Sequence, residues 1–220
     1  MTKFFFYSLF FLSPIYAYSD EYEFVASTKG GIGYKEDFQI EIDYGWFMTN
    51  NWTLTSGIRV QCVRDALARG IVDGEFKWAT EDDKMYNLLF PITTEYFIPL
   101  YRKEESSFAF FLEPGIILQL FPQDYFSIEY ESYKGSESKT WTKTYTGRNF
   151  HWAYCFGSLQ TGFSYNTGND FAISLGYELN NQDIYKKRRG TELHNIRFGD
   201  QMPAEKNLYH HLFIELMIFL

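Results

Sequence analysis

The last ten residues of the chain follow an alternating apolar pattern. Aliphatic residues occupy every second position up to the final residue, with Glu215 among the residues between them. The aliphatic positions are Leu212, Ile214, Leu216, Ile218 and Leu220. Successive side chains of a strand point to opposite faces, so the pattern predicts a strand with one wholly apolar face. Because the last residues of most soluble domains are poorly ordered, we interpret this ending as a strand in contact with lipid.

Residues 1–17 have the composition of an export signal. They begin with Lys3, continue through an apolar run from Phe4 to Leu12, and reach a small residue at Ala17. The run is shorter than the roughly 20 residues that a membrane-spanning helix needs. We therefore expect a secretory signal peptide over residues 1–17 and a mature chain over residues 18–220, with an uncleaved N-terminal anchor as the alternative.

The mature chain contains eight segments in which apolar and polar residues alternate. The clearest runs from Phe38 to Met48, and the first and sixth are weaker because glycine and small polar residues blur the pattern. The predicted strands cover 22–34, 38–48, 52–61, 85–100, 107–121, 152–165, 173–180 and 211–220. Such segments are typical of membrane barrels. The expected fold class is all-β, an eight-stranded antiparallel up-and-down transmembrane β-barrel.

A soluble eight-stranded calyx is the main alternative fold. It would need the apolar faces inside, which would put the charged residues of the same strands, such as Glu41 and Glu95, on the outside.

Pro91, Pro99 and Pro114 lie in or beside predicted strands, where each removes a hydrogen-bond donor. We expect local bulges or strand ends at these prolines.

The connections between the predicted strands alternate in length. Brief turns lie at 49–51, 101–106 and 166–169, and long connections lie near 64–84, 122–151 and 183–207. The connection at 35–37 is the exception, because it is short where a long one is expected. Outer-membrane barrels have short periplasmic turns and longer external loops. We therefore expect the long connections outside the cell and both termini in the periplasm.

The composition fits contact with lipid. Phe, Tyr and Trp make up 21% of the chain, and aromatic girdles at the two membrane interfaces would use them. The net charge of −8 argues against nucleic-acid binding, which needs a basic surface.

Cys62 and Cys155 are predicted to lie on outward faces of separate strands and to stay unpaired. No Cys/His spacing indicates a metal site, and we expect no cofactor.

The strand pattern also resembles a known group of proteins. The run LLFPITTEYFIPL from Leu88 and the ending IELMIFL are similar to those of the small outer-membrane β-barrel family common in Bacteroidetes, whose architecture is like that of OmpX and OmpW. The resemblance covers nearly the whole mature chain. It implies a porin-like barrel in the outer membrane of a Gram-negative bacterium, and it brings no catalytic or binding motif with it.

The inward faces of the predicted strands carry a set of charged residues. This set comprises Lys29, Glu41, Asp43, Arg59, Glu95, Glu113, Glu178 and Glu215. An eight-stranded barrel is just wide enough to be filled by side chains, and buried charges must be paired. We therefore expect a salt-bridged network that fills the lumen. Because carboxylates outnumber bases in the set, a narrow proton or cation path is the functional alternative.

An enzymatic function would depend on the histidines, which are His151, His194, His210 and His211. Some barrel enzymes use a histidine with serine or aspartate near the rim, so His210 and His211 with Asp200 and a loop serine form a candidate site. Adjacent strand residues point to opposite faces, so one member of the pair at most could enter such a site. No Gly-x-Ser-x-Gly motif supports it, and we expect no catalysis.

The longest connection, 122–151, is the better candidate for a binding surface. It contains the aromatic residues Tyr125, Phe126, Tyr130, Tyr133, Trp141 and Tyr145. Alternation over 125–133 and 139–146 predicts a hairpin that turns at Gly135-Ser136 and extends the flanking strands beyond the membrane. Exposed aromatic residues and a free strand edge fit docking to another protein. Packing on lipopolysaccharide and a merely solvated loop are the alternatives.

The last long connection contains the basic cluster Lys186, Lys187, Arg188 and Arg189. We expect this cluster to contact phosphates of the outer-leaflet lipid, including lipopolysaccharide, with an acidic protein partner as the alternative.

These features together predict a non-catalytic outer-membrane barrel, an interaction or accessory subunit of an envelope complex that acts through its external loops. The alternatives are a free-standing membrane-stabilising or adhesion barrel and a lipid-modifying enzyme of the outer membrane.

Overall fold

The structure of the chain is a computed structural model. It describes residues 23–33, 37–63, 69–72, 76–80, 85–103, 106–120, 124–132, 139–147, 153–167, 170–183, 186, 192–193, 196–197 and 208–220. The predicted signal peptide lies outside the described residues. Within the described residues, no helix is long and apolar enough to cross a membrane.

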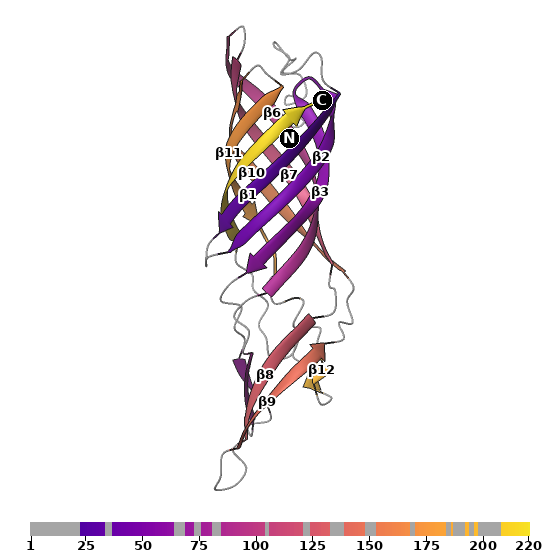
Figure 1. Ribbon diagram of the computed structural model, residues 1–220, viewed down its shortest axis with the longest axis vertical. Helices are drawn as coiled ribbons and strands as arrows, with labels where there is room; N and C mark the ends of the chain where they lie inside the picture. Colours follow the sequence, from indigo (N-terminus) through magenta and orange to yellow (C-terminus); the bar gives the residue numbers. More distant parts are fainter. Residues whose placement is uncertain are drawn as a thin grey trace, which may run out of the picture.

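Eight antiparallel strands close into a barrel, as Figure 1 shows. In order around the barrel they are β1 (Phe24–Gly33), β14 (Tyr209–Phe219), β11 (Phe171–Asn180), β10 (Ala153–Asn166), β7 (Ser106–Leu120), β6 (Met85–Lys103), β3 (Trp52–Val63) and β2 (Phe38–Thr49). The predicted fold class is confirmed, and each predicted strand corresponds to one barrel strand. Because β1 pairs with β14, the barrel has no open sheet edge.

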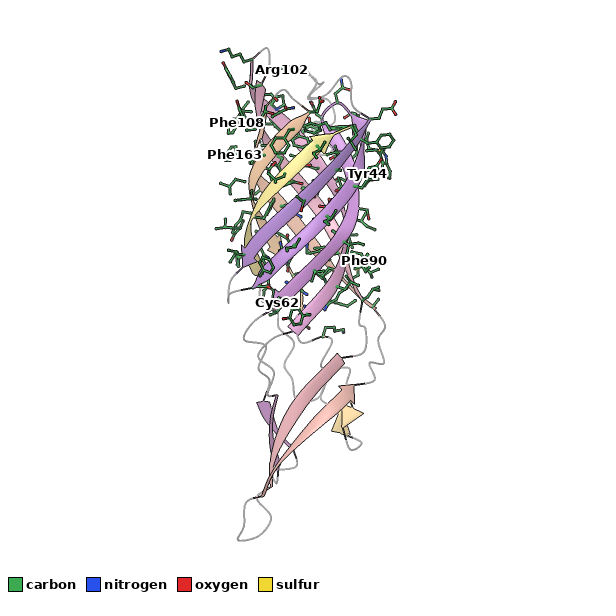
Figure 2. All side chains as sticks on the ribbon, viewed as in Figure 1. Tyr44, Cys62, Phe90, Arg102, Phe108 and Phe163 are labelled. Atoms are coloured by element: carbon green, nitrogen blue, oxygen red, sulfur yellow. The ribbon has the colours of Figure 1, made fainter. Side chains whose placement is uncertain are left out.

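The outside of the barrel is apolar. Ile42, Leu175 and Leu212 are 66%, 62% and 62% exposed, whereas the neighbouring Asp43, Ser174 and Phe213 are buried. Figure 2 shows Tyr44, Phe90, Phe108 and Phe163 on the outer surface. This alternation follows from the period of two in a strand. Exposure of so much apolar surface on every strand fits lipid contact, not water contact.

The connections divide between the two ends of the barrel. The brief turns after β2, β6 and β10 lie at the end where β1 begins and β14 ends, and the long connections lie at the other end (Figure 1). The predicted alternation is confirmed, including the short connection between β1 and β2 at the long-loop end.

The prolines disturb the sheet less than predicted. On β6 the register with β7 shifts between Pro99 and Tyr101, which confirms a bulge there. Pro91 pairs with Ile117 and Pro114 pairs with Leu159 without a register shift, so the expectation of a bulge was wrong at these two positions. A strand residue directs its N–H toward one neighbour only, so each proline removes a single ladder bond and the pairing around it can persist.

A second sheet lies beyond the long-loop end of the barrel (Figure 1). Its strands, in order, are β4 (Arg69–Val72), β5 (Phe76–Thr80), β8 (Asp124–Ser132) and β9 (Lys139–Gly147). The predicted hairpin is present as β8 and β9, but its description as a simple extension of the barrel strands was wrong, because β8 pairs with β5. A separate short pair consists of β12 (Glu192–Leu193) and β13 (Ile196–Arg197).

The two cysteines are unpaired, as predicted. Cys62 on β3 is partly exposed, and Cys155 on β10 is exposed. The two strands are three places apart in the barrel, so the thiols face the surroundings at separate positions.

Candidate functional site

Two ion pairs cross the barrel lumen. Nζ of Lys29 on β1 lies 2.9 Å from Oε1 and 3.0 Å from Oε2 of Glu113 on β7. Nη1 of Arg59 on β3 lies 2.8 Å from Oε1 of Glu178 on β11. In each pair the two strands are four places apart in either direction around the barrel, so they lie opposite each other. The side chains therefore meet in the middle of the lumen.

Register explains how the sequence assembles this network. Glu215, Lys29, Glu41 and Arg59 lie directly opposite one another on the adjacent strands β14, β1, β2 and β3. The row thus alternates negative and positive charges, which is the favourable arrangement for cross-strand neighbours. Arg59 Nε also contacts Glu41, so this carboxylate links the two bases.

Lys29 is shared among several carboxylates. Its Nζ lies 3.4 Å from Glu41, 3.6 Å from Asp43 and 3.7 Å from Glu215, in addition to the bond with Glu113. The structure thus joins seven of the eight predicted lumen residues through Lys29 and Arg59. Glu95, the eighth, is also buried, and its Oε1 has no hydrogen-bond partner among the described residues.

A chain of amides, which the sequence analysis missed, runs around the lumen toward the long-loop end. Gln182 donates to Gln119 at 3.3 Å, Gln119 to Asn87 at 2.9 Å, and Asn87 to Gln61 at 3.2 Å. Gln61 then donates to Asp37 at 2.9 Å. Gln119, Asn87 and Gln61 lie on the neighbouring strands β7, β6 and β3, while Gln182 lies just after β11 and Asp37 just before β2, so the chain joins the ends of these strands. The sequence pattern that could have predicted this chain is the recurrence of Asn and Gln at inward positions near the ends of several strands.

The lumen toward the chain termini contains an apolar cluster, which the sequence analysis also missed. Its buried residues, which we call the apolar plug, are Val25, Phe97, Ala109, Phe111, Ala172, Phe213, Met217 and Phe219. The plug meets the charged network where Lys29 Nζ lies 5.9 Å from the centre of the Phe213 ring. The sequence signal was that both faces of the strands become apolar near this end, as in the run from Phe108 to Leu112.

The two described histidines, His210 and His211, lie on opposite faces of β14. His211 is buried, and its Nε2 lies 3.0 Å from Oδ2 of Asp37. His210 is on the outer face, where its ring contacts Tyr177. Their placement on opposite faces is confirmed. Asp200 of the candidate catalytic site lies outside the described residues, as do the other two histidines, His151 and His194. Within the described part of the chain, no group of three or more His, Cys, Asp or Glu residues could hold a metal ion.

The aromatic residues of the longest connection lie mostly on the second sheet. Tyr125, Phe126 and Tyr130 are on β8, and Trp141 and Tyr145 are on β9. Tyr133 lies outside the described residues.

Of the basic cluster, the structure describes Lys186, whose Nζ lies 5.7 Å from the centre of the Tyr154 ring on β10. Lys187, Arg188 and Arg189 lie outside the described residues.

No protein-family model matches this chain, and no curated protein matches it. Solved structures similar to it are small outer-membrane β-barrels. Neisserial surface protein A matches with 9% identity and a TM-score of 0.43, covering 90% of this chain and 97% of that one. The N-terminal β-barrel domain of Pseudomonas aeruginosa OprF matches with 9% identity and a TM-score of 0.40, covering 89% and 97%. Ail, the attachment invasion locus protein of Yersinia pestis, matches with 11% identity and a TM-score of 0.35, covering 90% and 99%. The Bacteroidetes family suggested by the sequence is not confirmed.

Proposed function

We propose that this chain is an outer-membrane barrel that neither conducts nor catalyses, and that it serves as an interaction or accessory subunit of an envelope complex. The contacts would be made by the strands and loops at the end of the barrel away from the chain termini. The observation that carries this proposal is the filled lumen. Because side chains fill the lumen, we assign binding to the second sheet, which lies outside the barrel.

A membrane location is supported by the barrel itself. Only closed barrels and helices satisfy all backbone groups within a bilayer. This barrel is closed, and every strand carries exposed apolar residues on its outward face. The short turns lie at the end of the termini, which in outer-membrane barrels is the periplasmic end. The second sheet would then stand at the cell surface.

The interior favours a structural barrel over a channel. Arg59, Glu113 and Glu178 are at most 1% exposed, and their ion pairs span the lumen. Between these ion pairs and the chain termini, the buried apolar plug occupies part of the lumen. A conducting path needs a continuous polar or hydrated route, which both layers interrupt.

Contact with lipid phosphates is a second part of the proposal. Lys186 lies after β11 at the long-loop end, against the Tyr154 ring. Tyr154 is on the inward face of β10, where its ring stacks on the buried Phe156, so this contact lies at the mouth of the lumen. The support for phosphate binding is therefore the basic run 186–189 itself, which follows β11 at the long-loop end, because basic segments next to a membrane attract anionic headgroups such as the phosphates of lipopolysaccharide.

Purification from native membranes tests the proposal. The full chain, with an affinity tag ahead of β1, is extracted in mild detergent and its companions are identified by mass spectrometry. We expect a discrete companion protein in constant ratio, which disappears when residues 124–147 are replaced by a short linker. Replacing residues 192–197 is the matched control and should leave the companion in place. A compact monomer with only lipid bound would overturn the proposal.

A further inference from the structure

The strand register divides the second sheet into two chemically different faces. Residues directly opposite each other in antiparallel strands share a face, and alternate residues along a strand return to it. Trp78, Tyr130 and Trp141 are directly opposite one another on β5, β8 and β9. Phe126 and Tyr145 form a second row on the same face, and Phe76 lies in a third. We call this the aromatic face.

The opposite face is mostly polar, with Tyr125 and Ile71 as its large apolar or aromatic positions, and it carries two acidic and two basic residues. Glu131 on β8 pairs directly with Lys77 on β5 and with Thr140 on β9. Glu129 lies in the next row of this face, between Ala79 and Thr142. The other β9 positions on this face are threonines. The register therefore places the acidic and basic residues of this face, Glu129, Glu131, Arg69 and Lys77, in two neighbouring rows.

The aromatic face carries two lysines that the register leaves unmatched. Lys143 on β9 pairs with Ile128, and Lys139 pairs with Ser132. No acidic residue of the four strands occupies either row or the row between them. Asp124, which pairs with Gly147, is the one acidic position on this face of the four strands, and it lies two rows from Lys143. The face thus combines aromatic positions with two lysine positions on β9 that have no acidic residue of the four strands in their rows.

We propose that the aromatic face is the docking surface for an acidic protein partner; this inference rests on the proposed function. Tyrosine and tryptophan are the residues that most often carry binding energy at interfaces. The row of Trp78, Tyr130 and Trp141 lies between the rows of Lys139 and Lys143, and both lysines are on β9, a border strand of the sheet. Opposite charge at the border of an interface steers association and sets its register.

The position of the second sheet favours a protein over a lipid as the occupant. Lipid phosphates lie at the edge of the apolar band of the barrel, whereas Figure 1 places this sheet beyond that end. The aromatic rows would therefore meet a partner that also stands clear of the membrane surface.

The test compares two double variants of the full chain that remove equal charge from the two faces. K139Q/K143Q changes the aromatic face, and R69Q/K77Q changes the polar face of the same sheet. The companion protein is quantified after extraction in mild detergent. We expect about tenfold less companion with K139Q/K143Q, and little change with R69Q/K77Q. Equal companion yields in both variants would overturn the docking surface and leave the proposed function intact, whereas absence of any companion for the unchanged chain would overturn both.

A photo-crosslinking amino acid at position 143 or 144 gives an independent measurement, because these neighbouring positions belong to opposite faces. We expect crosslinks from position 143, and not from position 144, to an acidic segment of the companion protein. Crosslinks from position 143 to lipopolysaccharide or to a second copy of this chain would overturn the proposal. Because each variant changes one position, this measurement remains decisive even if a double variant fails to assemble.

Discussion

Gly176 on β11 lies directly opposite Phe213 on β14, and the Phe213 ring occupies the space that a Cβ at Gly176 would take. The next strand repeats the arrangement. Gly162 on β10 pairs with Gly176, and Cε1 of Phe111 lies 2.9 Å from the position of a Cβ at Gly162. Two glycines on neighbouring strands therefore make room for two rings of the apolar plug. Large and small residues alternate around the lumen so that it can be filled.

Replacing Gly176 with alanine should destabilise the barrel. The added methyl group would displace the Phe213 ring, and overpacking of a filled core costs about 1–3 kcal/mol. Gly30→Ala is the matched control, because nothing lies within 4 Å of a Cβ at that strand glycine. Urea unfolding of both variants in lipid vesicles measures the difference. Equal free energies of unfolding for the two variants would contradict the packing described for the plug.

Replacing Lys29 with methionine should also destabilise the barrel strongly. The change leaves Glu41, Asp43, Glu113 and Glu215 without the base they share. Removing one partner of a buried ion pair costs about 3–5 kcal/mol. Ile58→Met on the outer face is the control. A double-mutant cycle with Glu113→Gln should give a coupling energy of at least about 0.5 kcal/mol, and strict additivity would mean that the cross-lumen bond contributes nothing.

Lysine on the outer face should be costly in the middle of a strand and tolerated at its end. Ile214 lies in the middle of β14 and is 56% exposed, and Leu208 precedes the strand and is 57% exposed. At a bilayer midplane a lysine costs about 2–4 kcal/mol, and near the interface about 0–1 kcal/mol. Folding equilibria of Ile214→Lys and Leu208→Lys in vesicles check this. If neither substitution changed the free energy of folding, the outer face would not be in contact with lipid.

The purified chain should carry no steady current in a planar bilayer. Ion pairs across the lumen and the apolar plug interrupt the route for ions. Single-channel recording is the measurement, with an open porin in the same bilayer as the control. Uniform stepwise openings would instead support the proton or cation path that the excess of lumen carboxylates allows.

Much of the barrel was predictable because a strand has a period of two. Alternate residues of a strand share a face, so an inward Glu41 implies an inward Asp43. The same reasoning on other strands predicts that Arg59 and Glu178 also point inward. Which strands lie opposite each other was not predictable from alternation alone. The ion pair between Lys29 and Glu113, 84 residues apart, depends on barrel closure and strand order.

The second sheet was predicted only in part. The alternation of β8 and β9 is long enough to be recognised, and their hairpin is local in sequence. Strands β4 and β5 are four and five residues long, too short for a clear period. The pairing of Trp78 with Tyr130 joins segments far apart in the chain, so no local pattern could reveal the aromatic face.

Labelling of single cysteines on intact cells tests the central claim, that the barrel crosses the outer membrane with the second sheet outside. In a chain whose Cys62 and Cys155 are replaced by serine, Thr142→Cys on β9 and Lys103→Cys at the end of β6 are treated with a maleimide that cannot cross membranes. We predict that position 142 is labelled on intact cells, and that position 103 is labelled only after the outer membrane is permeabilised. Labelling of position 103 on intact cells, or of position 142 only after permeabilisation, would contradict the claim.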